Sequence, residues 1–307
     1  MRLKLREAIN RMGRVLEKGK LAIFVGSGIS VPSGLPTWDG LLLEFVNLCK
    51  RIEFLLPPEQ QQTEVFDNIQ DQIVKYPARV ATVVKRRILH VQNQKPELNV
   101  EGVLKRFLNE MFSGKQPNKY HELIVSTNYP YIITTNYDDL LEKAAREKGY
   151  TDLWLSSFSF NDAAKVASAL YEGRPAIIHA HGDLNSLALD DFVFTAEDYV
   201  RIRKKYPGFT MALQSIFMNY SVLFVGYGGS DPHLEDFVEE MRFLFKWSDL
   251  PELPLYFLTL REDKVSRVLE KYKETLRTDI IVLENYNETT ELLTALQKIS
   301  PREVNSA

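Results

Sequence analysis

Cysteine is almost absent from this sequence of 307 residues, which contains Cys49 alone. A single thiol can form no disulfide within the chain, and it cannot supply a zinc site built from cysteines. Long apolar runs are lacking too, so no segment is predicted to span a bilayer. The first twenty residues are charged throughout and lack the apolar core of a signal peptide. These absences predict a soluble, cytoplasmic protein.

An excess of one charge is also lacking. The formal net charge is −3, so no overall field would attract nucleic acid. Basic runs at 85–87 and 201–205 are typical of solvated helix faces. Hydrophobic residues make up 45% of the chain, which is enough for a sizeable core. We therefore expect no direct nucleic-acid binding and no membrane partner.

Short apolar runs alternate with segments of helical periodicity along most of the chain. The runs predicted as strands are 21–25, 131–135, 153–155, 176–181, 221–225, 255–260 and 280–283, and helices are predicted at 41–51 and 138–147. This alternation is typical of a parallel sheet covered on both faces, in which ligands bind beyond the carboxyl ends of the strands. We predict an α/β fold with a Rossmann-like doubly wound parallel sheet. Residues 1–307 are predicted to form one domain, with a helical insertion or small module at 52–125.

The first predicted strand stops abruptly at Gly26-Ser27-Gly28. Two glycines let the backbone turn sharply and approach a ligand closely, with N–H groups directed at a phosphate. The spacing is neither that of a dehydrogenase, since Val31 replaces the third glycine, nor that of a P-loop, since no Gly-Lys-Ser/Thr follows. A tight turn without a ligand remains the alternative.

A polar cluster, Thr135-Asn136-Tyr137-Asp138, follows the strand at 131–135. Asparagine offers two donors and an acceptor, so Asn136 is suited to hold a ribose hydroxyl and a water together. The alternative is that Asn136 or Asp138 caps the following helix. A similar sequence surrounds Asn128, but it lacks the preceding strand and runs into Pro130.

Two histidines, His179 and His181, close the strand at 176–181 and are followed by Gly182-Asp183. Alternate residues of a strand share a face, so the histidines and Asp183 form a conceivable metal site, although no further ligand set is evident. A core or capping histidine is a second alternative. An imidazole titrates near neutrality and can accept a proton, which favours a general base. We prefer His181, because His179 lies deeper in the strand.

A second glycine-rich turn follows the strand at 221–225 and contains Gly226, Tyr227 and Ser230. A turn that binds nothing would look similar. Between His181 and this turn lies a Thr-x-x-x-Tyr stretch from Thr195 to Tyr199, to which we assign no role.

These motifs together resemble the sirtuin family, which binds NAD. The family's first signature reads Gly-Ala-Gly-Ile-Ser, a spacer and Gly-Ile-Pro-Asp-Phe-Arg, and this chain has Gly26-Ser27-Gly28-Ile29-Ser30 and then Ser33-Gly34-Leu35-Pro36. Thr37, Trp38 and Asp39 stand where the family has aspartate, phenylalanine and arginine. The cluster at Asn136 resembles the family's Gln-Asn-Ile-Asp, and His181-Gly182 resembles its catalytic His-Gly. The resemblance covers roughly residues 21–231, with 52–125 unmatched.

The resemblance implies a particular branch of the family. The four-cysteine zinc module and the acyl-lysine groove of deacetylating sirtuins have no counterpart, so the chain is most similar to sirtuin-like NAD hydrolases of bacterial antiphage defence. That branch implies an NAD+ glycohydrolase without zinc that depletes NAD+. Asn136 would orient water and a ribose hydroxyl, and His181 would act as general base. The remaining pocket residues implied are Gly26, Ser27, Gly28, Ser30, Pro36, Asp39, Thr135, Asp138, Gly226, Tyr227 and Ser230.

Other activities remain open at this point. An ADP-ribosyltransferase or cyclase would use the same pocket, an NAD-dependent deacylase is a second rival, and a non-catalytic sensor of NAD or ADP-ribose is a third. Uncontrolled NAD+ hydrolysis is toxic, so some control is expected. The resemblance implies an oligomeric assembly and a partner such as a HerA-type ATPase.

Overall fold

The computed structural model describes residues 2–183, 193, 195–227, 240–241, 253–260 and 278–304. Its centre is a sheet of eight parallel strands in the order β1-β8-β7-β6-β2-β3-β5-β4. The strands are β1 (Arg2–Leu3), β2 (Leu21–Val25), β3 (Tyr131–Thr134), β4 (Ser157–Ser159), β5 (Ala176–His179), β6 (Ser221–Val225), β7 (Leu255–Leu260) and β8 (Thr278–Leu283). The predicted parallel α/β sheet is confirmed.

The central strands form the sheet because their residues are apolar on both faces, as expected for a sheet covered by helices on each side. All five residues of β2 and of β6 are buried, and Ile23 pairs with Ile132 of β3 and with Leu223 of β6. On one face, the ring of Phe224 stacks on Phe24 and on Phe257, with centroid separations of 5.0 and 4.1 Å.

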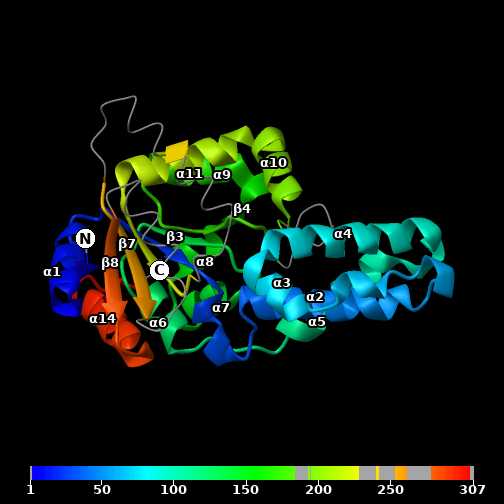
Figure 1. Cartoon of the computed structure of the whole chain (residues 1–307). Coiled ribbons are helices and arrows are strands. Elements are labelled where there is room, and N and C mark those ends of the chain that lie inside the picture. The colour runs from blue at the N-terminus through cyan, green and yellow to red at the C-terminus, as the bar shows by residue number, and fades with distance from the viewer. Residues whose placement is uncertain are drawn as a thin grey trace.

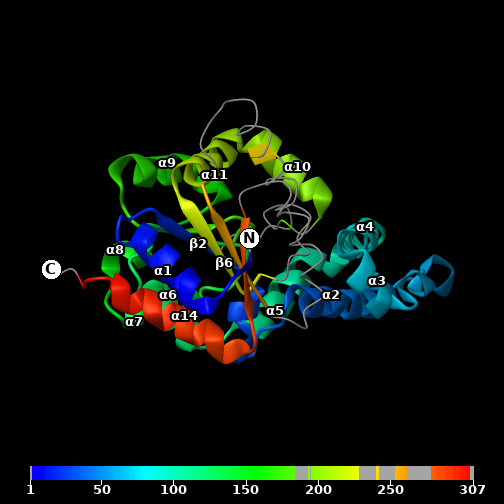
Figure 2. The same ribbon diagram turned by 60° about the vertical axis from the view of Figure 1, so that its left-hand side comes forward.

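Helices cover the two faces of the sheet separately (Figure 2). The phenylalanine face packs against α9 (Ala163–Glu172), α10 (Ala196–Lys205) and α11 (Pro207–Asn219). The opposite face packs against α1 (Leu5–Leu16), α6 (Lys119–Val125), α7 (Leu140–Glu147), α8 (Thr151–Leu155) and α14 (Tyr286–Ile299). None of the described helices combines the length and apolar composition needed to cross a lipid bilayer.

A third hydrophobic cluster lies beside the sheet and joins α2 (Trp38–Glu53), α3 (Ile69–Lys75), α4 (Pro77–Gln94) and α5 (Val100–Phe112). We call α2–α5 the helical module; Figure 1 shows it projecting from the sheet. Cys49 is buried in it, and burial, with Glu53 nearby, raises the pKa of this thiol to about 12. The predicted segment 52–125 thus contains three helices of the module and also α6, which packs on the sheet.

One predicted strand is wrong. Residues 153–155 belong to α8, and the edge strand is β4, which begins at Ser157. In a strand, Leu153 and Leu155 would lie on the same face and would be buried together. In the structure, Leu153 is buried, whereas Leu155 is 60% exposed.

Candidate active site

The predicted site residues follow the carboxyl ends of four adjacent strands, β6, β2, β3 and β5. The turn after β6 holds Gly226 and Tyr227, and the turn after β2 holds Gly26 to Ser30. Asn136 follows β3, and His181 follows β5. β2 is flanked by β6 on one side and by β3 on the other, so the strand order reverses direction at β2. Open α/β sheets bind ligands at the carboxyl ends of the strands beside such a reversal. Ser230 lies outside the described residues.

The two glycine-rich turns touch backbone to backbone. Gly26 N–H donates to Val225 O and Gly28 N–H donates to Gly226 O, each at 2.9 Å. A Cβ on Gly26 would lie 2.5 Å from Gly226 O, and one on Gly226, where φ is +65°, would lie 2.6 Å from the Ile29 side chain. Side chains are therefore excluded here by the contact between the turns.

The N–H groups predicted to hold a phosphate are largely engaged within the protein. Besides Gly26 and Gly28, Ile29 N–H donates to Gly26 O at 3.2 Å and Ser30 N–H donates to Ser27 O at 2.9 Å. The Ser27 hydroxyl accepts from Trp38 N–H at 3.2 Å, which ties this turn to the start of α2. A phosphate could accept hydrogen bonds from these N–H groups only by replacing their present acceptors within the protein.

Asn136 is held rigidly at the end of β3. Its side-chain Nδ2 donates to Gly26 O at 3.3 Å and to Ser30 Oγ at 3.2 Å, and its backbone N–H donates to Thr134 Oγ1 at 3.0 Å. Because a carbonyl can only accept, these contacts fix which end of the amide is nitrogen. The opposite atom, Oδ1, is buried and has no hydrogen-bond donor among the described residues.

Ser30 connects Asn136 to two further buried groups. Its hydroxyl donates to Asp138 Oδ2 at 2.9 Å and lies 3.2 Å from His121 Nε2. Asn118 N–H donates to Nδ1 of His121, so the neutral ring presents Nε2–H to the serine oxygen. Burial raises the pKa of Asp138 to about 6 and lowers the pKa of His121 to about 4.

Asp138 therefore has both of the roles that the sequence left open: it holds the start of α7 and it belongs to the polar network of the site. Its Oδ1 accepts from Leu140 N–H at 3.2 Å at the start of α7, while Oδ2 belongs to the Ser30 network. His121, which comes from α6, was not predicted, because a lone histidine on an amphipathic helix gives no signal of its own.

The two histidines at the end of β5, His179 within the strand and His181 just after it, have opposite protonation preferences. Burial opposes the charge on His179, but Glu142 at 2.7 Å from Nε2 and Asn136 O at 3.0 Å from Nδ1 raise its pKa to about 9. Burial alone lowers the pKa of His181 to about 3. At neutral pH, His179 is thus charged and paired with Glu142, whereas burial keeps His181 neutral.

The other predicted residues lie at the periphery of this network. Asp39 is exposed in the first turn of α2 and Pro36 is half-buried before it, and no described hydrogen bond joins either to Asn136. Thr135 is half-buried, with its N–H 3.4 Å from Val25 O. The Tyr227 ring packs edge-on against Phe24 at 5.8 Å.

The metal alternative finds no geometric support in the part of the chain that the structure describes. No three His, Cys, Asp or Glu side chains gather there as metal ligands. Nε2 of His179 is engaged by Glu142 rather than directed at a shared site.

The sequence is similar to one family model and to several curated proteins. A family model described as a SIR2-like domain matches residues 130–281. "Defense-associated sirtuin 2" of Bacillus subtilis is 24% identical over 302 residues, which cover 95% of this chain and 27% of the relative. "NAD(+) hydrolase ThsA" of Acinetobacter baumannii (strain 532279) is 25% identical over 239 residues, covering 78% of this chain and 42% of the relative.

A further relative, "NAD(+) hydrolase ThsA" of Enterococcus faecium, is 23% identical over 318 residues, covering 94% of this chain and 58% of the relative. The chain thus spans between about a quarter and three fifths of the length of these curated relatives.

Proposed function

We propose that this chain is an NAD+ hydrolase that acts in antiphage defence by depleting NAD+, and the match of a SIR2-like domain model to residues 130–281 supports this. The proposed reaction is hydrolysis of the bond between nicotinamide and ribose, which converts NAD+ and water to nicotinamide, ADP-ribose and a proton. The curated relatives support this proposal, since their names describe NAD(+) hydrolases and a defence-associated sirtuin.

The observation that carries the proposal is the buried Oδ1 of Asn136, which lacks a donor among the described residues. An unsatisfied buried acceptor is costly unless a ligand or water completes it. A water or a ribose hydroxyl donating to Oδ1 would be held at the carboxyl edge of the sheet, where the dinucleotide is proposed to bind. The rigid anchoring of Nδ2 by Gly26 and Ser30 would fix that direction.

The chemistry needs little from the protein beyond placement and a proton acceptor. Nicotinamide leaves as a neutral group while C1′ of the ribose gains positive charge, and the oxygen of the oriented water bonds to C1′ as the C1′–N bond breaks. The water's proton would pass to the neutral imidazole of His181, directly or through the ribose. His179 is unsuited to this step, because its raised pKa keeps it charged at neutral pH.

The remaining pocket roles belong to the same proposal. Ser27 would contact the pyrophosphate, together with N–H groups of the first turn that exchange their internal hydrogen bonds for it. Gly226 and Tyr227, in the adjoining turn after β6, would line the same pocket. Ser30 and Asp138 would hold Asn136. An oligomeric active form and activation by a HerA-type ATPase remain predictions from the resemblance.

Nicotinamide release by the purified chain tests the proposal, alone and with the product of the neighbouring gene. Asn136→Ala and His181→Ala should each lower the rate by about a hundredfold or more, the size typical of lost positioning for Asn136 and of lost acid–base assistance for His181. Asn128→Ala is the matched control, since Asn128 is exposed and lies in the similar Ser-Thr-Asn-Tyr sequence. Near-normal turnover by both site variants would refute the assignment.

Product analysis separates the rival activities. Linear ADP-ribose supports hydrolysis, cyclic ADP-ribose indicates a cyclase, and ADP-ribosylated protein indicates a transferase. Loss of an acyl group from a peptide would indicate a deacylase. NAD+ binding without nicotinamide release would indicate a sensor.

A further inference from the structure

The N-terminus of α10 is fixed by a reciprocal pair of hydrogen bonds between Thr195 and Asp198. The Thr195 hydroxyl accepts from Asp198 N–H at 3.2 Å, and Asp198 Oδ2 accepts from Thr195 N–H and from its hydroxyl, each at 2.9 Å. This capping box determines where the helix starts and how its first turn is oriented. It gives a structural role to the Thr-x-x-x-Tyr stretch of the sequence.

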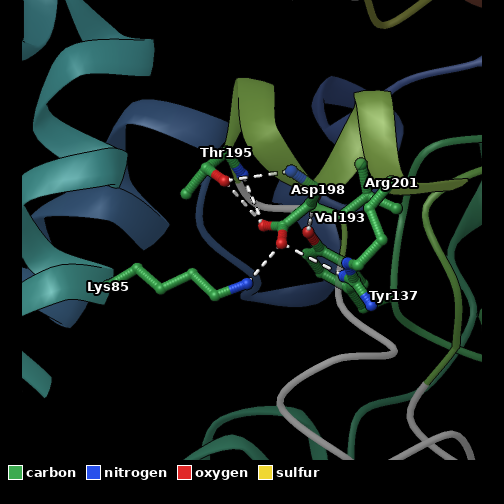
Figure 3. Close-up of polar contacts among 6 residues, drawn as sticks. All are labelled: Lys85, Tyr137, Val193, Thr195, Asp198 and Arg201. Carbon is green, nitrogen blue, oxygen red and sulfur yellow. Dashed lines mark hydrogen bonds and ion pairs between the residues drawn. The ribbon is translucent and has the colours of Figure 1, made fainter. Parts of the chain in front are cut away.

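The second oxygen of Asp198 is held by Lys85 from outside α10 and by Arg201 from within the helix (Figure 3). Oδ1 accepts from the ammonium group of Lys85, which comes from α4 of the helical module, and from Arg201 Nη2 at 3.1 Å. The side chains of Asp198 and Lys85 are only 3% and 15% exposed. Burial opposes ionisation of Asp198, but Lys85 and Thr195 outweigh it and hold the pKa of the carboxyl below its usual value.

The same end of α10 contacts the two loops of the candidate active site. The ring of Tyr199 meets the His181 imidazole edge-on, with centroids 5.6 Å apart. Val193, just before the capping box, donates its N–H to His181 O at 3.3 Å and accepts from the Tyr137 hydroxyl at 2.9 Å. Tyr137 directly follows Asn136, so Val193 and the start of α10 contact His181 itself and the residue next to Asn136.

We propose that Asp198 is a positioning residue for His181, and that Lys85 makes this positioning depend on the helical module. The inference rests on the proposed function, since His181 is taken as the proton acceptor. A displacement of α4 would leave Asp198 buried without its main counter-ion, which is unfavourable enough to shift the end of α10 instead. Tyr199 and Val193 would then move with it and turn the imidazole away from its working position.

Three variants test this coupling. Asp198→Asn keeps the shape and the hydrogen bonds of the capping box but removes the charge, and Lys85→Gln removes the counter-ion. We expect each to lower kcat for nicotinamide release by about ten- to a hundredfold, the size of effect typical of a misplaced group, with KM changed less than about twofold. Lys85→Arg, which keeps the charge, should restore most of the activity.

The matched control is the neighbouring ion pair between the same two helices. Arg86 and Glu197 join α4 to α10 at the surface, with side chains 68% and 64% exposed. Arg86→Gln and Glu197→Gln should leave kcat within about twofold, because exposed pairs contribute little. Equal losses in the control and test variants would indicate a general weakening of the helix contact and would overturn the proposal.

A readout independent of turnover separates this inference from the proposed function. The protein contains five histidines, so the imidazole signals of selectively labelled protein can be assigned with a His181→Gln variant. The His181 signal should shift in Asp198→Asn and Lys85→Gln and stay in place in Arg86→Gln. An unchanged signal in the first two variants refutes the positioning role, whereas wild-type protein that releases no nicotinamide under any condition refutes the function instead.

Discussion

The buried pair of His179 and Glu142 makes a strong prediction about stability. The two side chains are 2% and 13% exposed, and Glu142 also accepts from the Ser157 hydroxyl at 2.6 Å. Removing one partner of a buried ion pair typically costs about 3–5 kcal/mol, a large share of the roughly 5–15 kcal/mol that stabilises a domain. For Glu142→Gln we expect about 3 kcal/mol, the lower end of that range, because the amide can still hydrogen-bond both neighbours.

The pH dependence of this loss identifies its cause. The pKa of folded His179, about 9, lies above its ordinary 6.5, so the stabilisation is complete below about pH 6.5 and is lost as the pH rises through 9. Burial opposes ionisation of Glu142, but His179 lowers its pKa below 4.5, so the carboxylate's contribution is present above that value. Wild-type and Glu142→Gln protein should differ most near pH 6 and converge towards pH 10.

Urea unfolding at several pH values measures both quantities. Asp139→Asn is the control, since it removes a surface ion pair with Lys143 from the same helix and should cost less than about 1 kcal/mol. A difference between wild type and Glu142→Gln that stays constant from pH 6 to pH 10 would refute the charged pair.

Two further predictions concern the backbone conformation at Gly226 and the backbone carbonyls that Arg302 holds. Gly226→Ala should destabilise the fold by about 2–4 kcal/mol, because it combines a positive φ with a clash against Ile29. Gly173→Ala has a similar φ with nothing within 4 Å, so its smaller effect, about 1 kcal/mol, isolates the clash; equal losses by urea unfolding would contradict this reasoning. Arg302→Ala should cost about 2–4 kcal/mol, since the guanidinium donates to the carbonyls of Val125, Thr127 and Tyr129 at 2.9, 3.2 and 2.6 Å. Arg302→Lys should recover only part of this stability, and full recovery would show that charge alone suffices.

The central strands could be predicted from the sequence because burial on both faces leaves continuous apolar runs. β2 and β6 were located to the residue. The edge strand could not be found in this way, because β4 reads Ser-Phe-Ser and pairs on one side only. The neighbouring apolar residues of α8 resembled a strand more closely than β4 itself does.

The candidate site was predictable to the extent that its residues follow strands. Gly26, Asn136 and His181 are found from their position after an apolar run, and a parallel sheet brings such positions to one edge. Glu142 and His121 lie on helices, and their partners are fixed only by the packing of α7 and α6 on the sheet. No pattern within either helix identifies them as members of a polar network.

The burial of Cys49 has a practical consequence for experiments. Thiol reagents attack the thiolate, so a lone sulfhydryl that is enclosed by the helical module and ionises only near pH 12 should resist them. The natural chain therefore offers a nearly silent background for site-directed labelling. A cysteine introduced at Tyr171, which is 94% exposed, would carry a fluorophore without first removing the native one.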